Sequence, residues 1–420
     1  MDLINRFKGN KTLLNGAFFS LFSFINRGFV FLLLLILANY ISPAEYGYLS
    51  LFSTIVVLTG YIICLSSEGY LTISYFQEGQ DGVKYTFSVI LIIGILVTSL
   101  FVIIILIGGD TLSTLLDLPQ NILLIAVLIS FFTALANVNL DYFRIQERVN
   151  LYGVFSCGNA LLNFIITILL IKYFSMSWEG RAYAQFGCSL LFGLFCIFFF
   201  IRKKFYSLNI KDKIIPIVYW ALPLIPLHAT NFLRQGVDRY IINYHHTIAD
   251  VGLFSFALNI ANAITMIGFG FNQSFSVDIY KILSDSITNE EKLRKIRKLI
   301  RLVLLVFILA TIIVTMVCYC ILPILLPNYA MSINYFVILS IYAFFVCYYL
   351  LFTNFVFYFK NTKAIMYWSV GSSTLHMLLS LLLTQYSLYL TSAIYCVSQA
   401  LFAFGIQWQA NRELSKRLLR

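Results

Sequence analysis

The chain has 420 residues, of which 60% are hydrophobic and only 11% are charged, and its formal net charge is +11. Soluble domains carry roughly 25% charged residues, so this composition excludes a soluble globular protein and predicts an all-α, polytopic membrane protein. The positive charge requires no nucleic-acid partner, because basic loops beside a membrane contact anionic lipid headgroups. We therefore expect membrane lipids as partners and no nucleic acid.

Twelve apolar stretches are long enough to cross a membrane, since about 20 helical residues span ~30 Å of hydrocarbon. In chain order, spans are expected at 12–39, 46–66, 84–108, 121–141, 151–172, 181–201, 216–241, 250–275, 299–322, 331–358, 364–384 and 389–409. The first is too long for a cleavable signal and has no small-residue cleavage site, so we expect it to remain as a span. The second and the seventh are the least typical, because charged residues lie at or near their ends.

The distribution of basic residues predicts the topology. With the N-terminus in the cytoplasm, 24 of the 29 Lys and Arg residues fall in cytoplasmic segments, whereas only Lys172 and Arg181 fall in an outside loop. Cytoplasmic loops of membrane proteins are enriched in Lys and Arg. We therefore expect both termini in the cytoplasm.

One short element occurs twice, after the first span and after the seventh. Ser42–Gly47 reads Ser-Pro-Ala-Glu-Tyr-Gly and Thr247–Gly252 reads Thr-Ile-Ala-Asp-Val-Gly, at an offset of 205 residues (252 − 47). Each has a hydroxyl residue followed three positions later by a carboxylate, which is the pattern of a capping box at the start of a helix. We refer to these two segments as the capping hexapeptides and interpret them as the trace of an internal duplication.

The duplication predicts two lobes of six helices each, residues 1–205 and 206–420, joined by a basic linker. A second match supports it, because Tyr142-Phe143-Arg144 after the fourth span resembles Tyr358-Phe359-Lys360 after the tenth. Six is an even number, so both lobes enter the membrane from the same side and form parallel repeats around a central cavity. When that cavity opens to the cytoplasm, the two capping hexapeptides should meet at the periplasmic rim.

Two arginines are expected within the membrane. Arg27 lies near the middle of the first span, where an arginine costs at least ~2.5 kcal/mol, and Arg234 lies at a similar place in the seventh. Either each pairs with a buried carboxylate or with carbonyl groups, or both line a cationic cavity for an anionic ligand. The planar guanidinium suits phosphate, because it can donate to two oxygens at once.

The seventh span has a polar face, since His228, Asn231, Gln235 and Asp238 recur every three or four residues. Arg239 either belongs to the same cavity or pairs with Asp238 near the outer interface. The candidate substrate cavity is therefore formed by Arg27, His228, Asn231, Arg234, Gln235, Asp238 and Arg239. The carboxylates that could bind a coupling ion are Asp238 and Glu68, although Glu68 could equally be solvated at the membrane edge.

The twelve-span layout in two halves, the Ser42–Gly47 segment, and the Pro223, Pro226 and Asp238-Arg239 pattern of the seventh span resemble the polysaccharide transport family of the multidrug/oligosaccharidyl-lipid/polysaccharide exporter superfamily. Within it, the chain is most similar to the O-antigen flippases. The resemblance implies a bacterial inner-membrane transporter, without cofactor, that moves an undecaprenyl-pyrophosphate-linked oligosaccharide from the cytoplasmic to the periplasmic leaflet. It also implies an H⁺ or Na⁺ gradient as driving force, and a polysaccharide polymerase and a chain-length regulator as partners.

Two other functions remain open on the sequence alone. A multidrug antiporter of the same superfamily would need acidic cavity residues for cationic drugs, whereas the deepest charges here are arginines. A membrane-bound polymerase or glycosyltransferase would place catalytic groups in sizeable outside loops, and the outside loops expected here are short. We therefore expect no enzymatic activity. The eight cysteines all lie in apolar stretches without metal-ligand spacing to histidine, so we also expect no metal site.

Overall fold

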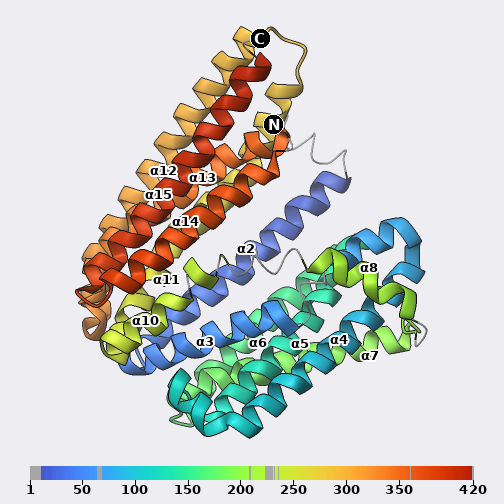
Figure 1. The fold of residues 1–420 in the computed structure, drawn as a ribbon, viewed down its shortest axis with the longest axis vertical. Coiled ribbons are helices and arrows are strands. Elements are labelled where there is room, and N and C mark those ends of the chain that lie inside the picture. The colour runs from blue at the N-terminus through green and yellow to red at the C-terminus, as the bar shows by residue number, and fades with distance from the viewer. Residues whose placement is uncertain are drawn as a thin grey trace. The chain divides into compact units, whose positions relative to one another are not determined.

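The structure is a computed structural model that describes residues 11–63, 69–207, 210–222, 230, 232–234, 236–359 and 361–418 (Figure 1). Within these ranges it contains helices and no strand, as the composition predicts. The chain forms two compact units. The first unit comprises Met1–Ile41 with Tyr48–Ala229, and the second comprises Ser42–Gly47 with Thr230–Arg420.

The first unit contains seven described helices: α2 (Lys11–Leu37), α3 (Pro43–Ile63, from Tyr48 onward), α4 (Tyr70–Leu116), α5 (Gln120–Ile145), α6 (Val149–Lys172), α7 (Glu179–Arg202) and α8 (Lys211–Ala221). Its core lies where α5 packs against α4 and α7. The rings of Phe87 and Phe200 stack there with centroids 4.3 Å apart. On the side facing α3, the hydroxyls of Thr59 and Ser130 hydrogen-bond at 2.8 Å.

The second unit contains α10 (Val237–His245), α11 (Ile248–Ser284), α12 (Asn289–Leu325), the 3₁₀ turn η2 (Pro327–Tyr329), α13 (Ser332–Tyr358), α14 (Thr362–Leu383) and α15 (Leu388–Leu418). Its long helices run side by side, and α13 packs between α11 and α15 (Figure 1). Phe336, Leu339 and Ala343 on α13 are completely buried. The apolar α13 is therefore the centre of this unit.

The two capping hexapeptides are in contact within the second unit. Ser42 and Glu45 form the predicted reciprocal bonds, at 2.7 Å and 3.3 Å, and Thr247 and Asp250 form theirs at 3.1 Å and 3.2 Å. A Cβ atom at Gly252 would overlap the carbonyl oxygen of Pro43, and one at Gly47 would overlap that of Ile248. Glycine at both positions is what permits this close approach.

Tyr46 anchors the first capping hexapeptide in the core of the second unit. Its side chain is 1% exposed, and its hydroxyl accepts a hydrogen bond of 3.0 Å from the Asn259 amide. Its ring lies edge-on to Phe256 and Tyr329, with centroids 5.6 and 5.8 Å away. These contacts explain why six residues near the start of the chain belong to the second unit.

The compact units differ from the expected lobes 1–205 and 206–420 at a second place, because α8 belongs to the first unit. Ile210 and Ile217 pack on Val89 of α4. The Nζ of Lys213 donates to the Glu78 carboxylate at 2.7 Å. Gly79, next to Glu78, has φ +65° and interrupts α4 at this point, a conformation that favours glycine.

Eleven helices among the described residues are long and apolar enough to cross a membrane, whereas the sequence predicted twelve spans. The seventh expected span, 216–241, includes residues 223–229, 231 and 235, which lie outside the described residues, so it stays a prediction.

Candidate functional site

The sequence-predicted site residues have different surroundings. Arg27 lies on α2 of the first unit with an exposed side chain. Arg234 and Asp238 are buried in the second unit, at 7% and 1% exposure, and Arg239 is half-buried beside them. The remaining four lie outside the described residues: Glu68, His228, Asn231 and Gln235. The membership of these residues in one cavity therefore stays a prediction.

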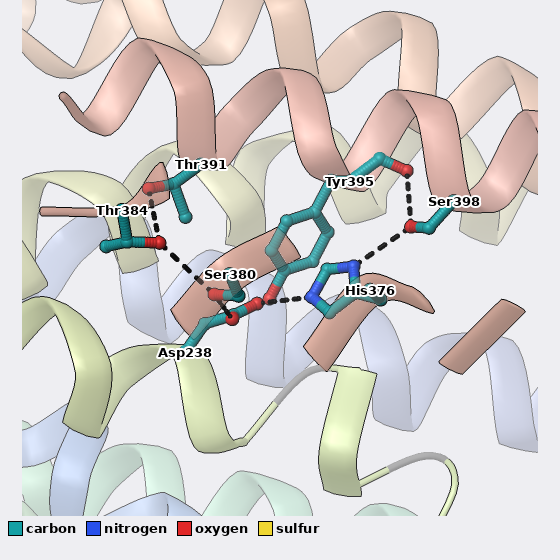
Figure 2. Close-up of polar contacts among 7 residues, drawn as sticks. All are labelled: Asp238, His376, Ser380, Thr384, Thr391, Tyr395 and Ser398. Carbon is teal, nitrogen blue, oxygen red and sulfur yellow. Dashed lines mark hydrogen bonds and ion pairs between the residues drawn. The ribbon is translucent and has the colours of Figure 1, made fainter. Parts of the chain in front are cut away.

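Asp238 is the centre of a buried polar cluster that joins α10, α14 and α15 (Figure 2). One carboxylate oxygen lies 2.7 Å from Nε2 of His376, and the other accepts a hydrogen bond from the Ser380 hydroxyl. The second ring nitrogen of His376, Nδ1, lies 2.9 Å from the hydroxyl of Ser398. Asp238 and both nitrogens of His376 therefore all have hydrogen-bond partners, as buried polar groups require.

A chain of hydroxyl groups continues from Asp238 along α14. The Ser380 hydroxyl lies 3.2 Å from that of Thr384, to which Thr391 of α15 donates at 3.1 Å. The carbonyl of Thr384 contacts Nε2 of His246, at the end of α10, at 2.6 Å. Hydrogen-bonded groups therefore continue from the buried carboxylate to a half-buried histidine.

Aromatic rings enclose the Asp238–His376 pair. The ring of Tyr395 lies edge-on to the imidazole, with centroids 4.8 Å apart, and its hydroxyl end points toward Asp238 (Figure 2). Tyr342 and Phe254 pack against Tyr395 in turn. Such surroundings have a low effective dielectric constant, which strengthens the hydrogen bonds within the pair.

Arg234 is held by neutral groups of the last two helices. Its guanidinium donates to Gln399 at 3.0 Å, to Ser372 at 3.1 Å and to Ser373 at 2.9 Å, and it lies 5.0 Å from the ring centroid of Phe402. In the part of the chain that the structure describes, its Nε has no hydrogen-bond partner. Arg234 thus keeps a buried positive charge that side-chain dipoles and a ring face stabilise.

Several residues of the Asp238 cluster were not predicted from the sequence, because the expected site residues were mainly the charged and polar residues of the first and seventh spans. His376 and the hydroxyl residues were read only as part of an apolar span. A signal was present, because α14 has small polar residues every three or four positions along one face. These residues are Ser369, Ser372, Ser373, His376, Ser380 and Thr384, all at most 7% exposed.

Comparison with known proteins gives consistent matches. A family described as polysaccharide biosynthesis protein matches residues 13–277. Lsg locus protein 1 of Haemophilus influenzae is 24% identical over 270 residues, which are 63% of this chain and 65% of that protein, so the match spans just under two thirds of that relative. An uncharacterized membrane protein of the same organism is 22% identical over 83% of this chain and 84% of its own length.

Two solved structures share the fold. A multidrug resistance transporter of the MATE family and the MOP superfamily, in an inward-facing conformation, has a TM-score of 0.70 at 12% identity, over 95% of this chain and 96% of that one. The lipid II flippase MurJ, in an inward closed conformation, has a TM-score of 0.73 at 14% identity, over 96% and 90% of the two chains. The fold is therefore that of these multi-pass membrane transporters.

Proposed function

The chain belongs to the polysaccharide biosynthesis protein family, and on that premise we propose that it is a flippase for an undecaprenyl-pyrophosphate-linked O-antigen repeat unit. It moves this unit from the cytoplasmic to the periplasmic leaflet of the bacterial inner membrane by alternating access, with both termini in the cytoplasm. The observation that carries the proposal is the family match over residues 13–277, and the transporter fold supports it. Its partners are then a polysaccharide polymerase and a chain-length regulator.

In this proposal Arg27 and Arg234 attract the pyrophosphate group. Arg234 supports this role because its hydrogen-bond partners are neutral, so its positive charge remains available to an anion when the cavity opens. Neutral partners can release the guanidinium at lower cost than a buried carboxylate would, because no second buried charge is left unpaired.

Asp238 with His376 is the proposed coupling site, and its ion is a proton. Hard metal cations prefer oxygen ligands, whereas one carboxylate oxygen of Asp238 is already engaged by an imidazole nitrogen. Uptake of one proton neutralises a pair made of a carboxylate and a neutral imidazole. A neutral pair is easier to keep buried, so protonation would favour the state in which Asp238 and His376 are buried against each other.

The test is complementation of a host strain that lacks the gene. Arg234→Ala and Arg27→Ala should abolish surface polysaccharide at normal protein level, with lipid-linked repeat units retained in the cytoplasmic leaflet. Arg→Lys should restore it only in part, because lysine keeps the charge but lacks two-point geometry. Arg202→Ala, at the exposed end of α7, is the matched control and should leave polysaccharide unchanged.

Three outcomes would contradict the proposal. Normal surface polysaccharide in both alanine variants would show that the two arginines are not needed for transport. Normal surface polysaccharide in the strain that lacks the gene would show that the protein is not the flippase. Resistance of a drug-sensitive host expressing the chain, without any change in polysaccharide, would favour a multidrug antiporter.

A further inference from the structure

The first unit contains a polar cavity that is separate from the Asp238 cluster. It has a volume of about 280 Å³ and lies between α2, α5, α6 and α7. Its polar lining is rich in carboxamides, from Asn26, Asn159, Asn163 and Gln185, and it includes one charged side chain, Arg181. Sequence analysis assigned Arg181 to an outside loop, whereas the structure places it in the first turn of α7 with its side chain directed to α6.

Arg181 brings a positive charge that no acid neutralises within the described residues. Its Nη1 donates to the Asn163 side-chain oxygen and to the Thr167 hydroxyl, the latter at 3.3 Å. No ion pair includes Arg181 within the described ranges. The cavity lining likewise contains no described carboxylate. A cavity with a fixed cation and no acid selects an anion and repels a metal cation.

The other groups of the lining indicate that the anion also carries hydroxyl groups. The side-chain oxygen of Asn159 is buried without a hydrogen-bond partner among the described residues, so it can accept from a donor on a ligand. Asn26 and Gln185 add further amide groups, each able to donate and accept. Phe29 and Leu33 add apolar surface to the lining, which suits the C–H face of a sugar ring.

We propose that this cavity binds a monosaccharide that carries a carboxylate, with the acid group at Arg181 and ring hydroxyls at the amides. The volume lies just below the ~300–1,000 Å³ of sites for drug-sized ligands, which limits the occupant to about one sugar ring. That such a sugar arrives as a unit of the transported oligosaccharide rests on the proposed function. The binding itself does not.

The experiment measures binding of free sugars to the purified full-length protein by saturation-transfer difference NMR, which detects weak ligands. D-Glucuronate should bind, and neutral D-glucose should bind at least about tenfold more weakly, because it lacks the charge-assisted bonds to the guanidinium. Arg181→Gln should weaken glucuronate binding by a similar factor. Arg202→Gln, at the other end of the same helix and exposed, is the matched control and should not change it.

A second variant keeps the test decisive if Arg181→Gln does not fold. Asn159→Asp places a carboxylate in the lining while leaving Arg181 in place, and it should abolish glucuronate binding through repulsion. Unchanged glucuronate binding in the variants that fold would overturn the proposal. Equal binding of glucose would do the same, and so would displacement of glucuronate by an equal concentration of inorganic phosphate, because the cavity would then bind any anion.

Failure of this proposal and failure of the flippase function can be told apart. If glucuronate binds through Arg181 but loss of the gene leaves surface polysaccharide unchanged, the flippase function fails and the sugar site remains. If the gene is required for polysaccharide but glucuronate does not bind, only the sugar site fails.

Discussion

The Asp238 cluster of the second unit and the Arg181 cavity of the first unit stabilise a buried charge in opposite ways. Asp238 is 1% exposed and has hydrogen-bond partners within the protein in His376 and Ser380. Arg181 has two neutral partners on one nitrogen and faces a cavity of about 280 Å³. The comparison shows that the second unit satisfies its buried charged group with its own side chains, whereas the first unit presents one to an open cavity.

The largest expected effect comes from breaking the buried pair. Asp238→Ala should lower the free energy of unfolding by about 1–3 kcal/mol for each of the two buried groups that lose their partner, the His376 imidazole and the Ser380 hydroxyl. Arg181→Gln should cost much less, because its surroundings already include open volume. Thermal unfolding of the detergent-solubilised protein measures both, with Asp212→Ala at an exposed site of α8 as the control.

A neutral double variant sharpens the same contrast. Asp238→Asn combined with His376→Gln replaces the pair by two amides of similar size, which can hydrogen-bond without a charge. It should recover most of the stability lost in Asp238→Ala while remaining unable to respond to a pH gradient. Equal melting temperatures for Asp238→Ala and the native protein would show that the Asp238 cluster does not stabilise the folded protein.

The next effect concerns the contact between the two capping hexapeptides. Gly252→Ala should destabilise the protein by about 1–3 kcal/mol, because its methyl group would overlap the Pro43 carbonyl. Gly270→Ala in the same helix has nothing within 4 Å of the added methyl. It should leave stability equal or raise it, since alanine is favoured over glycine in helices. Thermal unfolding should show a lower melting temperature for Gly252→Ala and an equal or higher one for Gly270→Ala. A decrease in both variants would contradict the contact.

A smaller effect is expected from the caps themselves. Ser42→Ala and Thr247→Ala should each cost about 0.5–2 kcal/mol, because each removes the side-chain acceptor of the first helical turn. The two losses should be similar, since both capping boxes have the same pair of reciprocal bonds to backbone N–H groups. Thr114→Ala, at an exposed position within α4, is the control for loss of a hydroxyl group. If only one of the two variants lost stability, the cap removed in the other variant would be redundant.

The smallest effect is the pH dependence of the Lys213–Glu78 pair. The hydrogen bond from Lys213 to Glu78 raises the pKa of the lysine above its ordinary value. A raised folded-state pKa contributes stability that is fully present below the unfolded-state value and is lost as the pH rises through the folded-state value. As the pH rises above about 10, the free energy of unfolding of the native protein should therefore fall slightly more than that of Glu78→Gln. Both side chains are exposed, so the difference is small.

Much of the fold could be predicted because its signals are local. Apolar length predicted the helices, and the capping pattern predicted the start of α11 at Ile248 and of α3 at Pro43. The seventh span stays a prediction, because residues 223–229, 231 and 235 within it lie outside the described ranges. The assignment of Ser42–Gly47 to the second unit depends on Tyr46 packing against residues more than 200 positions away, which local patterns only suggest.

The candidate site was predicted less completely. Arg234 and Asp238 were found because charges are rare and costly in apolar spans. His376 and Ser380 were missed, since serine and histidine fit into a span without lowering its hydropathy enough to be noticed. Arg181 was misassigned because it lies two residues after the start of α7, where a long side chain can turn either toward solvent or into the protein.

The placement of Tyr46 also has a consequence for biogenesis. The partners of the first capping hexapeptide are made 205 residues after it (252 − 47). At ribosomal rates of about 5–20 residues per second, Tyr46 waits roughly 10–40 s before the segment that buries it leaves the ribosome. During that interval the nascent first unit exposes a tyrosine and a helix start that have no place in its own core. The second unit, in turn, can complete its core only by taking up a peptide that was inserted long before, so the order of synthesis is also an order of assembly.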